Sequence, residues 1–263
     1  GDDVDFYERY GAATQSNVLS FLTFDQQNPN SILSCLRCAR ENARTVREII
    51  SSTMWEELNK FYLFVRGAAV AKMAEHSNEF LSEVKRYSLL LVGVMESLMS
   101  RDEAWHFARM GRNLERADKT SRILDVKYFI LLPNPSHVGS QVDVVQWGAL
   151  LESTSALQMY RRTFGRIQPV NVVDFLMLNA QFPRSMRFCV GAAEKSLMEI
   201  CGTDDSDSAP LREVRSLGSQ LTNAKASEII EGGLHQFVDN YQSHLNDIGQ
   251  AISETFFQVA TPV

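Results

Sequence analysis

No part of this chain has the run of about 20 apolar residues that a membrane-spanning helix requires. The most apolar stretch, residues 87–99, is interrupted by Gly93, Glu96 and two serines. The N-terminal residues 1–5 are mostly acidic, whereas a secretory signal begins with basic and then apolar residues. We therefore expect a cytoplasmic protein that has no membrane partner.

Cysteine is scarce, with four residues in 263, which argues against a secreted disulfide framework. Cys35 and Cys38 form a Cys-x-x-Cys pair, a redox or metal motif when it opens a helix or has a second pair at ligand spacing. The helix is expected to begin near Ser31, which puts Cys35 a full turn inside it. Cys189 and Cys201 are not spaced as in a zinc ribbon. We therefore expect Cys35 and Cys38 to be small core residues.

Signature motifs of nucleotide binding and hydrolysis are absent as well. The chain has no P-loop, no GxGxxG after a strand, no GxSxG and no HExxH. Ferritin-like di-metal bundles need Glu-x-x-His pairs on two helices, and the chain does not carry them on two helices. We expect no cofactor and no metal. The net charge of -6 argues against a nucleic-acid partner.

What the chain does have is helical periodicity, with almost no period-2 alternation. Asn28-Pro29-Asn30-Ser31 is typical of a turn followed by a helix N-cap. The pattern predicts an all-α, multi-helix bundle of about ten helices with mostly up-down connections, in a single domain over residues 1–263. The expected helices cover residues 14–24, 31–51, 53–75, 79–100, 102–132, 142–164, 170–179, 184–200, 211–223 and 227–259, the last bent at Gly232-Gly233.

The helix expected over residues 102–132 carries an acidic strip. Glu115, Asp118, Arg122 and Asp125 are spaced three, four and three, so they share one flank at the edge of the apolar face. Crowded carboxylates need compensation from Arg122, from arginines of another helix or from a cation. An ion-pair network that includes Asp118 and Asp125 is favoured over a functional site. The cationic residues Arg112, Arg116 and Lys119 are expected on the side opposite the core.

A basic stripe with the same spacing lies in residues 31–51. Arg37, Arg40, Arg44 and Arg47 share a face beside apolar residues. Planar guanidinium groups suit carboxylate or phosphate, so the stripe is interpreted as an anion site or as the partner of the acidic strip. Mutual ion pairing between the two helices is the favoured alternative.

Two smaller features complete the candidates. Arg184 and Arg187 follow Pro183 at an expected helix start, where solvated arginines are the default and a phosphate site is the alternative. His235 follows two glycines and is interpreted either as a general base or, more commonly for a lone histidine, as a hydrogen-bonded core residue.

Residues 101–126, RDEAWHFARMGRNLERADKTSRILDV, resemble the signature helix of the alpha-E family, a bacterial all-helical family named for its Glu-Arg pair. The pair is Glu115-Arg116 here. The likeness extends to residues 28–59, 142–162, 175–189 and 233–237. Family members usually begin with an earlier copy of the Glu-Arg helix. Glu8-Arg9 lacks the surrounding pattern, so that N-terminal part of the family pattern is expected to be missing.

The resemblance implies a protein encoded beside, or fused to, a circularly permuted ATP-grasp protein, and often near a transglutaminase-like peptidase. We accordingly expect a partner or substrate-presenting module of a peptide-synthesis or peptide-modification system that binds an acidic ligand, a peptide or its partner. The residues expected to bind are Arg37, Arg40, Arg44, Arg112, Arg122, Arg184 and Arg187.

Two alternatives remain open. The first is an enzyme for amide transfer or hydrolysis, with Glu115 as general acid or base and Arg116, Arg112 or Arg122 stabilising an anion. The second is a purely structural oligomerisation bundle, which predicts no cavity beside Glu115.

Overall fold

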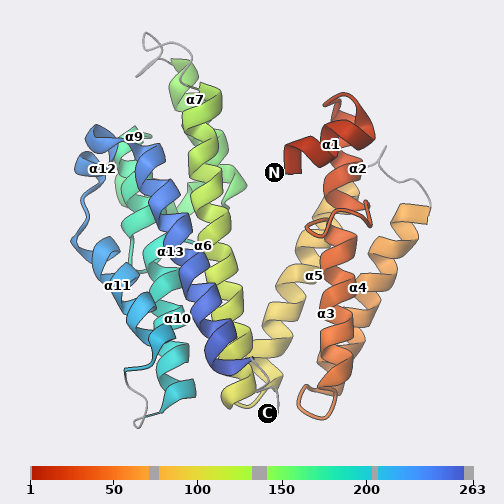
Figure 1. Ribbon diagram of the computed structural model, residues 1–263. Coiled ribbons are helices and arrows are strands. Elements are labelled where there is room, and N and C mark those ends of the chain that lie inside the picture. The colour runs from red at the N-terminus through yellow and green to blue at the C-terminus, as the bar shows by residue number, and fades with distance from the viewer. Residues whose placement is uncertain (1, 71–76, 132–140, 203–206, 258–263) are drawn as a thin grey trace. The chain divides into compact units, whose positions relative to one another are not determined.

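The computed structural model describes residues 2–70, 77–131, 141–202 and 207–257 (Figure 1). These ranges contain thirteen α-helices and one π-helix and no strand, which confirms the all-α class with somewhat more helices than expected. The chain divides into two compact units, Gly1–Arg101 and Asp102–Val263, at the point where the sequence predicts a helix restart. None of the described helices is both long enough and apolar enough to cross a membrane.

The described residues of the first unit, 2–70 and 77–101, form five helices. They are α1 (Asp2–Tyr10), α2 (Gln15–Thr23), α3 (Ile32–Thr45), α4 (Ser52–Val70) and α5 (Ser77–Leu98). Helix α4 packs against both α3 and α5, and the three lie side by side in Figure 1. Leu36 of α3, Phe61 and Val65 of α4 and Phe80 of α5 form the buried centre of this unit. Each such side chain contributes about 1.5–3 kcal/mol through burial.

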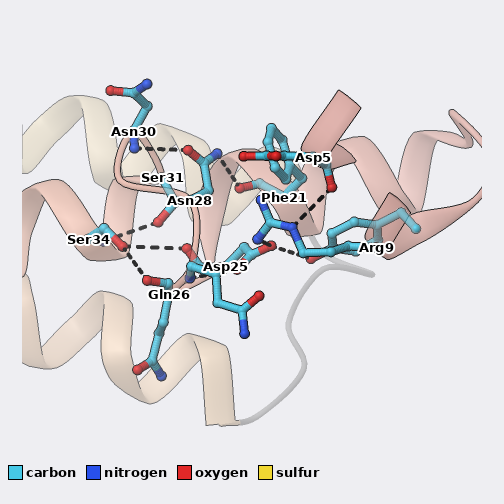
Figure 2. Close-up of polar contacts among 11 residues, drawn as sticks. Asp5, Arg9, Phe21, Asp25, Gln26, Asn28, Asn30, Ser31 and Ser34 are labelled. Carbon is cyan, nitrogen blue, oxygen red and sulfur yellow. Dashed lines mark hydrogen bonds and ion pairs between the residues drawn. The ribbon is translucent and has the colours of Figure 1, made fainter. Parts of the chain in front are cut away.

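The predicted turn before α3 is confirmed. The Ser31 side chain accepts a hydrogen bond from the Ser34 backbone N–H at 3.2 Å, as an N-cap does (Figure 2). Asn28 donates its side-chain amide to the Phe21 carbonyl at 3.0 Å, and this bond ties the turn to the end of α2. The cap and the turn together fix where α3 begins.

Helix α1 is an element that sequence periodicity does not predict. Arg9 connects it to Asp25, in the segment between α2 and α3. Arg9 Nη1 lies 2.8 Å from Asp25 Oδ2, and its guanidinium carbon lies 5.2 Å from the centre of the Phe21 ring (Figure 2). Arg9 Nε also donates to the Asp5 carbonyl at 3.1 Å. Arg9 therefore has a structural role within the first unit.

The expectation that Cys35 and Cys38 are core residues is wrong, because both are exposed. Each follows a buried leucine, Leu33 or Leu36, by two positions. Two helical residues correspond to a rotation of about 200°, which turns both thiols away from the core. Helix α3 also ends at Thr45 and not near residue 51.

The second unit is built around the longest helix, α6 (Glu103–Leu131). The other helices are α7 (Gln141–Ser153), α8 (Leu157–Phe164), α9 (Pro169–Val173), the π-helix η3 (Asp174–Leu178), α10 (Met186–Cys201), α11 (Ala209–Asn223), α12 (Ala226–Gly232) and α13 (Leu234–Phe256). Helix α6 packs against α7, α10 and α13, and Figure 1 shows it alongside α13 and α10. Ala117 and Leu124 of α6 are fully buried, so they mark the face of α6 that packs into the core of this unit.

Two predicted helices are each divided in two. The helix expected over residues 142–164 is interrupted after α7, where Ser155 adopts a left-handed backbone conformation with φ of 56°. The final helix is interrupted at Gly233, whose φ of 104° is rare for any residue with a side chain. The expected bend at Gly232-Gly233 is therefore a break that separates α12 from α13. The C-terminal ends of three predicted helices, at residues 71–75, 132 and 258–259, lie outside the described residues.

Candidate functional site

The Glu115-Arg116 pair of α6 borders a cavity of about 190 Å³. We call it the α6 cavity. It lies where α6 meets the residues just before α10 and the end of α7. Its polar lining consists of Arg112, Glu115, Arg116, Lys119 and Thr120 from α6, Arg184 from the chain before α10, and Ser153 and Thr154 from the end of α7. The alternative of a purely structural oligomerisation bundle predicted no cavity beside Glu115, so this cavity counts against it.

Positive charge predominates in the α6 cavity. Three guanidinium groups, those of Arg112, Arg116 and Arg184, and the Lys119 ammonium face a single carboxylate, that of Glu115. Glu115 already forms an ion pair with Lys119 at 3.1 Å, and its side chain is 66% exposed. The excess of positive over negative charge along the lining makes the cavity suitable for an anion.

Two hydrogen bonds between distant parts of the chain hold the cavity wall in place. Arg116 Nη1 donates to the Pro183 carbonyl at 3.2 Å, and Thr120 Oγ1 donates to the Arg184 carbonyl at 2.9 Å. Helix α10 then begins with Ser185 as its N-cap, which accepts a hydrogen bond from the Phe188 N–H at 3.1 Å. The backbone of Arg184 is thus fixed against α6 whatever its side chain binds.

Burial and crowding both act on Arg116. Burial lowers the pKa of its guanidinium group, and the neighbouring positive charges of Arg184 and Arg112 lower it further, while Cys189 opposes the shift. These like charges repel one another, and a bound anion would relieve that repulsion.

Cys189 is buried near the three arginines and is not an activated nucleophile. Burial raises the pKa of its thiol to about 11, although Arg116, Arg184 and Arg112 act in the opposite direction. The group therefore remains a protonated thiol at neutral pH, and only the thiolate is an effective nucleophile.

The acidic strip of α6 divides among several partners. Arg122 Nε lies 2.8 Å from Asp118 Oδ2, so Arg122 supplies part of the compensation that the crowded carboxylates need. Asp125 Oδ1 lies 2.7 Å from His235 Nδ1 of α13. His235 is therefore a hydrogen-bonded, partly buried residue, in line with the more common interpretation. Glu115 is exposed and belongs to the α6 cavity, which corrects its expected place on a half-buried flank.

The expectation that Arg112, Arg116 and Lys119 lie opposite the core is wrong in part. Lys119 is exposed, but Arg112 and Arg116 are only partly exposed because the segment before α10 covers this side of α6. Thr120, one helical turn after Arg116, is a site residue that the sequence interpretation missed. Its spacing of four from Arg116 is the signal that could have identified it.

The basic stripe of the first unit has partners within that unit. Arg40 Nε donates to Asn59 Oδ1 at 2.7 Å, and Arg40 and Arg44 each lie 2.9 Å from a carboxylate oxygen of Glu41. Arg37 lines a separate cavity of about 140 Å³. Arg47 falls beyond the end of α3, so the four arginines do not form one helical stripe. Pairing of this stripe with the acidic strip of α6 stays a prediction.

Of the residues predicted to bind anions, Arg112 and Arg184 come together with Glu115 and Arg116. Arg187 lines a different cavity. Among the residues that the structure describes, no group of three or more His, Cys, Asp or Glu side chains could hold a metal ion.

Comparison with known proteins identifies relatives of this chain. The sequence model of the Alpha-E family, described as a predicted alpha-helical domain with a conserved ER motif, matches residues 1–257. An uncharacterized protein of Mycobacterium bovis and two of Mycobacterium tuberculosis are each 22% identical to the chain over 271 residues. The match covers 95% of this chain and 29% of each relative, so the chain spans less than a third of their length. No solved structure matches the chain significantly.

Proposed function

The chain belongs to the Alpha-E family, and we propose that it is a binding module that holds an anionic group in the α6 cavity. We further propose that the module presents this group to an ATP-grasp partner that forms or modifies peptide bonds. The observation that carries the proposal is the cluster of three guanidinium groups and one ammonium around a single carboxylate, at the Glu115-Arg116 pair that resembles the family's Glu-Arg motif. Such a cluster favours carboxylate or phosphate.

The size of the cavity limits what it can hold. At about 190 Å³ the cavity is smaller than the roughly 300–1,000 Å³ of a pocket that encloses a drug-sized ligand. That space accommodates the charged end of a ligand, such as a carboxylate or an acyl phosphate, and excludes a whole peptide. The remainder of the ligand would extend into solvent or towards the partner.

The proposed partner is a circularly permuted ATP-grasp protein, as the family resemblance implies. ATP-grasp enzymes activate a carboxylate as an acyl phosphate before they form an amide bond. Both species carry oxyanions that match planar guanidinium groups. We place this system in the bacterial cytoplasm, where ATP is available, and the mycobacterial relatives are consistent with a bacterial setting.

The alternative of an enzyme that uses Glu115 is less well supported. Glu115 does border the cavity next to Arg116, but its side chain is largely exposed and ion-paired with Lys119. A general acid usually depends on burial to bring its pKa near neutrality. If Glu115→Gln abolished turnover in a reconstituted system and left ligand binding intact, the enzyme alternative would be favoured.

Calorimetric titration with acetyl phosphate and with inorganic phosphate tests the binding proposal. Arg184→Gln removes one charged donor while its carbonyl still accepts from Thr120. A charge-assisted hydrogen bond contributes about 1.5–3 kcal/mol, so the affinity should fall by about 10- to 100-fold. Arg122→Gln is the matched control, because Arg122 lies outside the cavity. Equal affinity for the wild type and both variants would contradict the proposed site.

The partner proposal has its own test, which is sedimentation of the chain with the neighbouring ATP-grasp protein, with and without ATP. We expect a complex at micromolar concentrations. No complex under either condition would remove the partner from the proposal and leave the anion site to be judged by the titration.

A further inference from the structure

The cavity that Arg187 lines has a volume of about 590 Å³, larger than the α6 cavity, and lies between α10 and α11 beside α6. We call it the α10–α11 groove. It shares no lining residue with the α6 cavity. Its charged residues are Arg109 of α6, Arg187, Glu194 and Lys195 of α10, and Arg215 of α11. Four cationic groups therefore face one carboxylate.

Small residues keep the groove open. Gly191 of α10 and Gly218 of α11 both line it. A Cβ atom added at Gly191 would meet nothing within 4 Å, so the space above this residue is empty. At Gly218 the nearest atom to an added Cβ would be Val190 Cγ1, at 3.7 Å. The absence of side chains at these glycines leaves space for a ligand between the two helices.

Two of the guanidinium groups in the groove, those of Arg109 and Arg187, are held in position by hydrogen bonds. Arg109 Nη1 donates to Ser196 Oγ at 3.1 Å and to the Ala192 carbonyl at 3.3 Å, and its guanidinium carbon lies 5.4 Å from the centre of the Trp105 ring. Arg187 Nη1 donates to the Leu178 carbonyl at 3.4 Å. Side chains that are already ordered lose less entropy when they bind a ligand.

The cationic groups are spread along the groove. Arg187 and Lys195 are eight residues apart on α10, so their Cα atoms are separated by about 12 Å along the helix axis, at 1.5 Å per residue. Arg215 of α11 approaches Glu194 of α10 at 3.5 Å, so it belongs to the same end as Lys195. A compact anion such as phosphate can reach only one end. An extended peptide covers about 12 Å with three to four residues.

From this spacing we infer that the α10–α11 groove binds an extended acidic peptide segment of about four residues. One carboxylate lies at Arg187 and another at Lys195 and Arg215, while Arg109 faces the ligand between or beside them. The peptide backbone passes over Gly191 and Gly218. This inference does not depend on the proposed function of the α6 cavity.

The test is fluorescence anisotropy with a fluorescein-labelled tetraglutamate whose ends are blocked, titrated with the full chain at low ionic strength. Lys195→Gln changes an exposed side chain and is expected to leave the fold intact. Each removed cation should weaken binding by about three- to fivefold, because an ion pair at an exposed site contributes at most about 1 kcal/mol. The double variant Lys195→Gln/Arg187→Gln should therefore lose at least about tenfold.

Two further variants separate a groove site from general attraction. Gly191→Leu fills the empty space without changing any charge, so it should also abolish saturable binding. Arg122→Gln removes a positive charge from α6 outside the groove and should leave the affinity unchanged. A blocked tetraglutamine should not bind.

The inference is overturned if Gly191→Leu binds tetraglutamate as the wild type does, or if Arg122→Gln weakens binding as much as Lys195→Gln. It is also overturned if inorganic phosphate displaces the peptide at a concentration similar to that of unlabelled tetraglutamate, because that result would indicate a compact anion site. Loss of tetraglutamate binding in the groove variants, together with unchanged titration of the α6 cavity by acetyl phosphate, supports it.

Discussion

Replacement of Asp143 by asparagine should destabilise the second unit, because it breaks a buried ion pair between α6 and α7. Lys127 Nζ lies 2.6 Å from Asp143 Oδ1, and the two side chains are only 7% and 11% exposed. The same ammonium donates to Gln146 Oε1 at 2.9 Å and lies 5.1 Å from the centre of the Trp147 ring. Asp143→Asn keeps the shape of the side chain and removes its charge.

Removal of one partner from a buried ion pair typically costs about 3–5 kcal/mol, because the other charge stays buried without compensation. Gln146 and Trp147 still contact Lys127 in the variant, so we expect a loss near the lower end, about 3 kcal/mol. The pair matters for the site because α7 also carries Ser153, and Thr154 follows it, on the wall of the α6 cavity.

Urea denaturation followed by circular dichroism measures this loss. The double variant Lys127→Met/Asp143→Leu is the control, because exchange of the whole pair for apolar groups is often neutral or stabilising. We expect the double variant to be at least about 2 kcal/mol more stable than Asp143→Asn. A loss of less than about 1 kcal/mol for Asp143→Asn would show that water reaches Lys127, and the reasoning from burial would be refuted.

Three further predictions concern reactivity, pH and backbone. Alkylation at pH 8 should modify the exposed Cys35 and Cys38 within minutes and spare Cys189 until the chain is unfolded, as mass spectrometry of the peptides would show. Because burial raises the pKa of Cys189 to about 11, the unfolded chain loses its proton first, so the free energy of unfolding should fall between about pH 9 and pH 11. This fall should be smaller by about 2–3 kcal/mol in Cys189→Ala; an equal fall in the variant would contradict it. Gly233→Ala should lower the free energy of unfolding, measured in urea, by about 1–2 kcal/mol, because φ is 104° there. An unchanged free energy would show that alanine lets α12 and α13 form one continuous helix.

The sequence predicts the helices well because their signals are local. Ser31 caps its helix as the sequence pattern indicates, and α6 covers almost the whole expected range. The errors arise where a local signal is weak. Ser155 interrupts a continuous apolar pattern with a left-handed conformation, for which serine gives no warning.

The candidate site is less predictable because its parts are distant in the sequence. Periodicity places Arg112, Glu115 and Arg116 near one another on a single helix, but it cannot show that Arg184 lies beside them. The contact depends on a bond between Thr120 and a carbonyl 64 residues away. The same limit applies to His235 and Asp125, which are 110 residues apart and yet form a hydrogen bond.

The claim that anions bind beside the Glu115-Arg116 pair is tested most directly by nitrogen-15 NMR of the arginine Nε groups during titration with acetyl phosphate. We predict saturable shifts for Arg112, Arg116 and Arg184, with no comparable shift for Arg122. Small, linear shifts of similar size at all four arginines would mean that the α6 cavity does not bind the anion and would contradict the account.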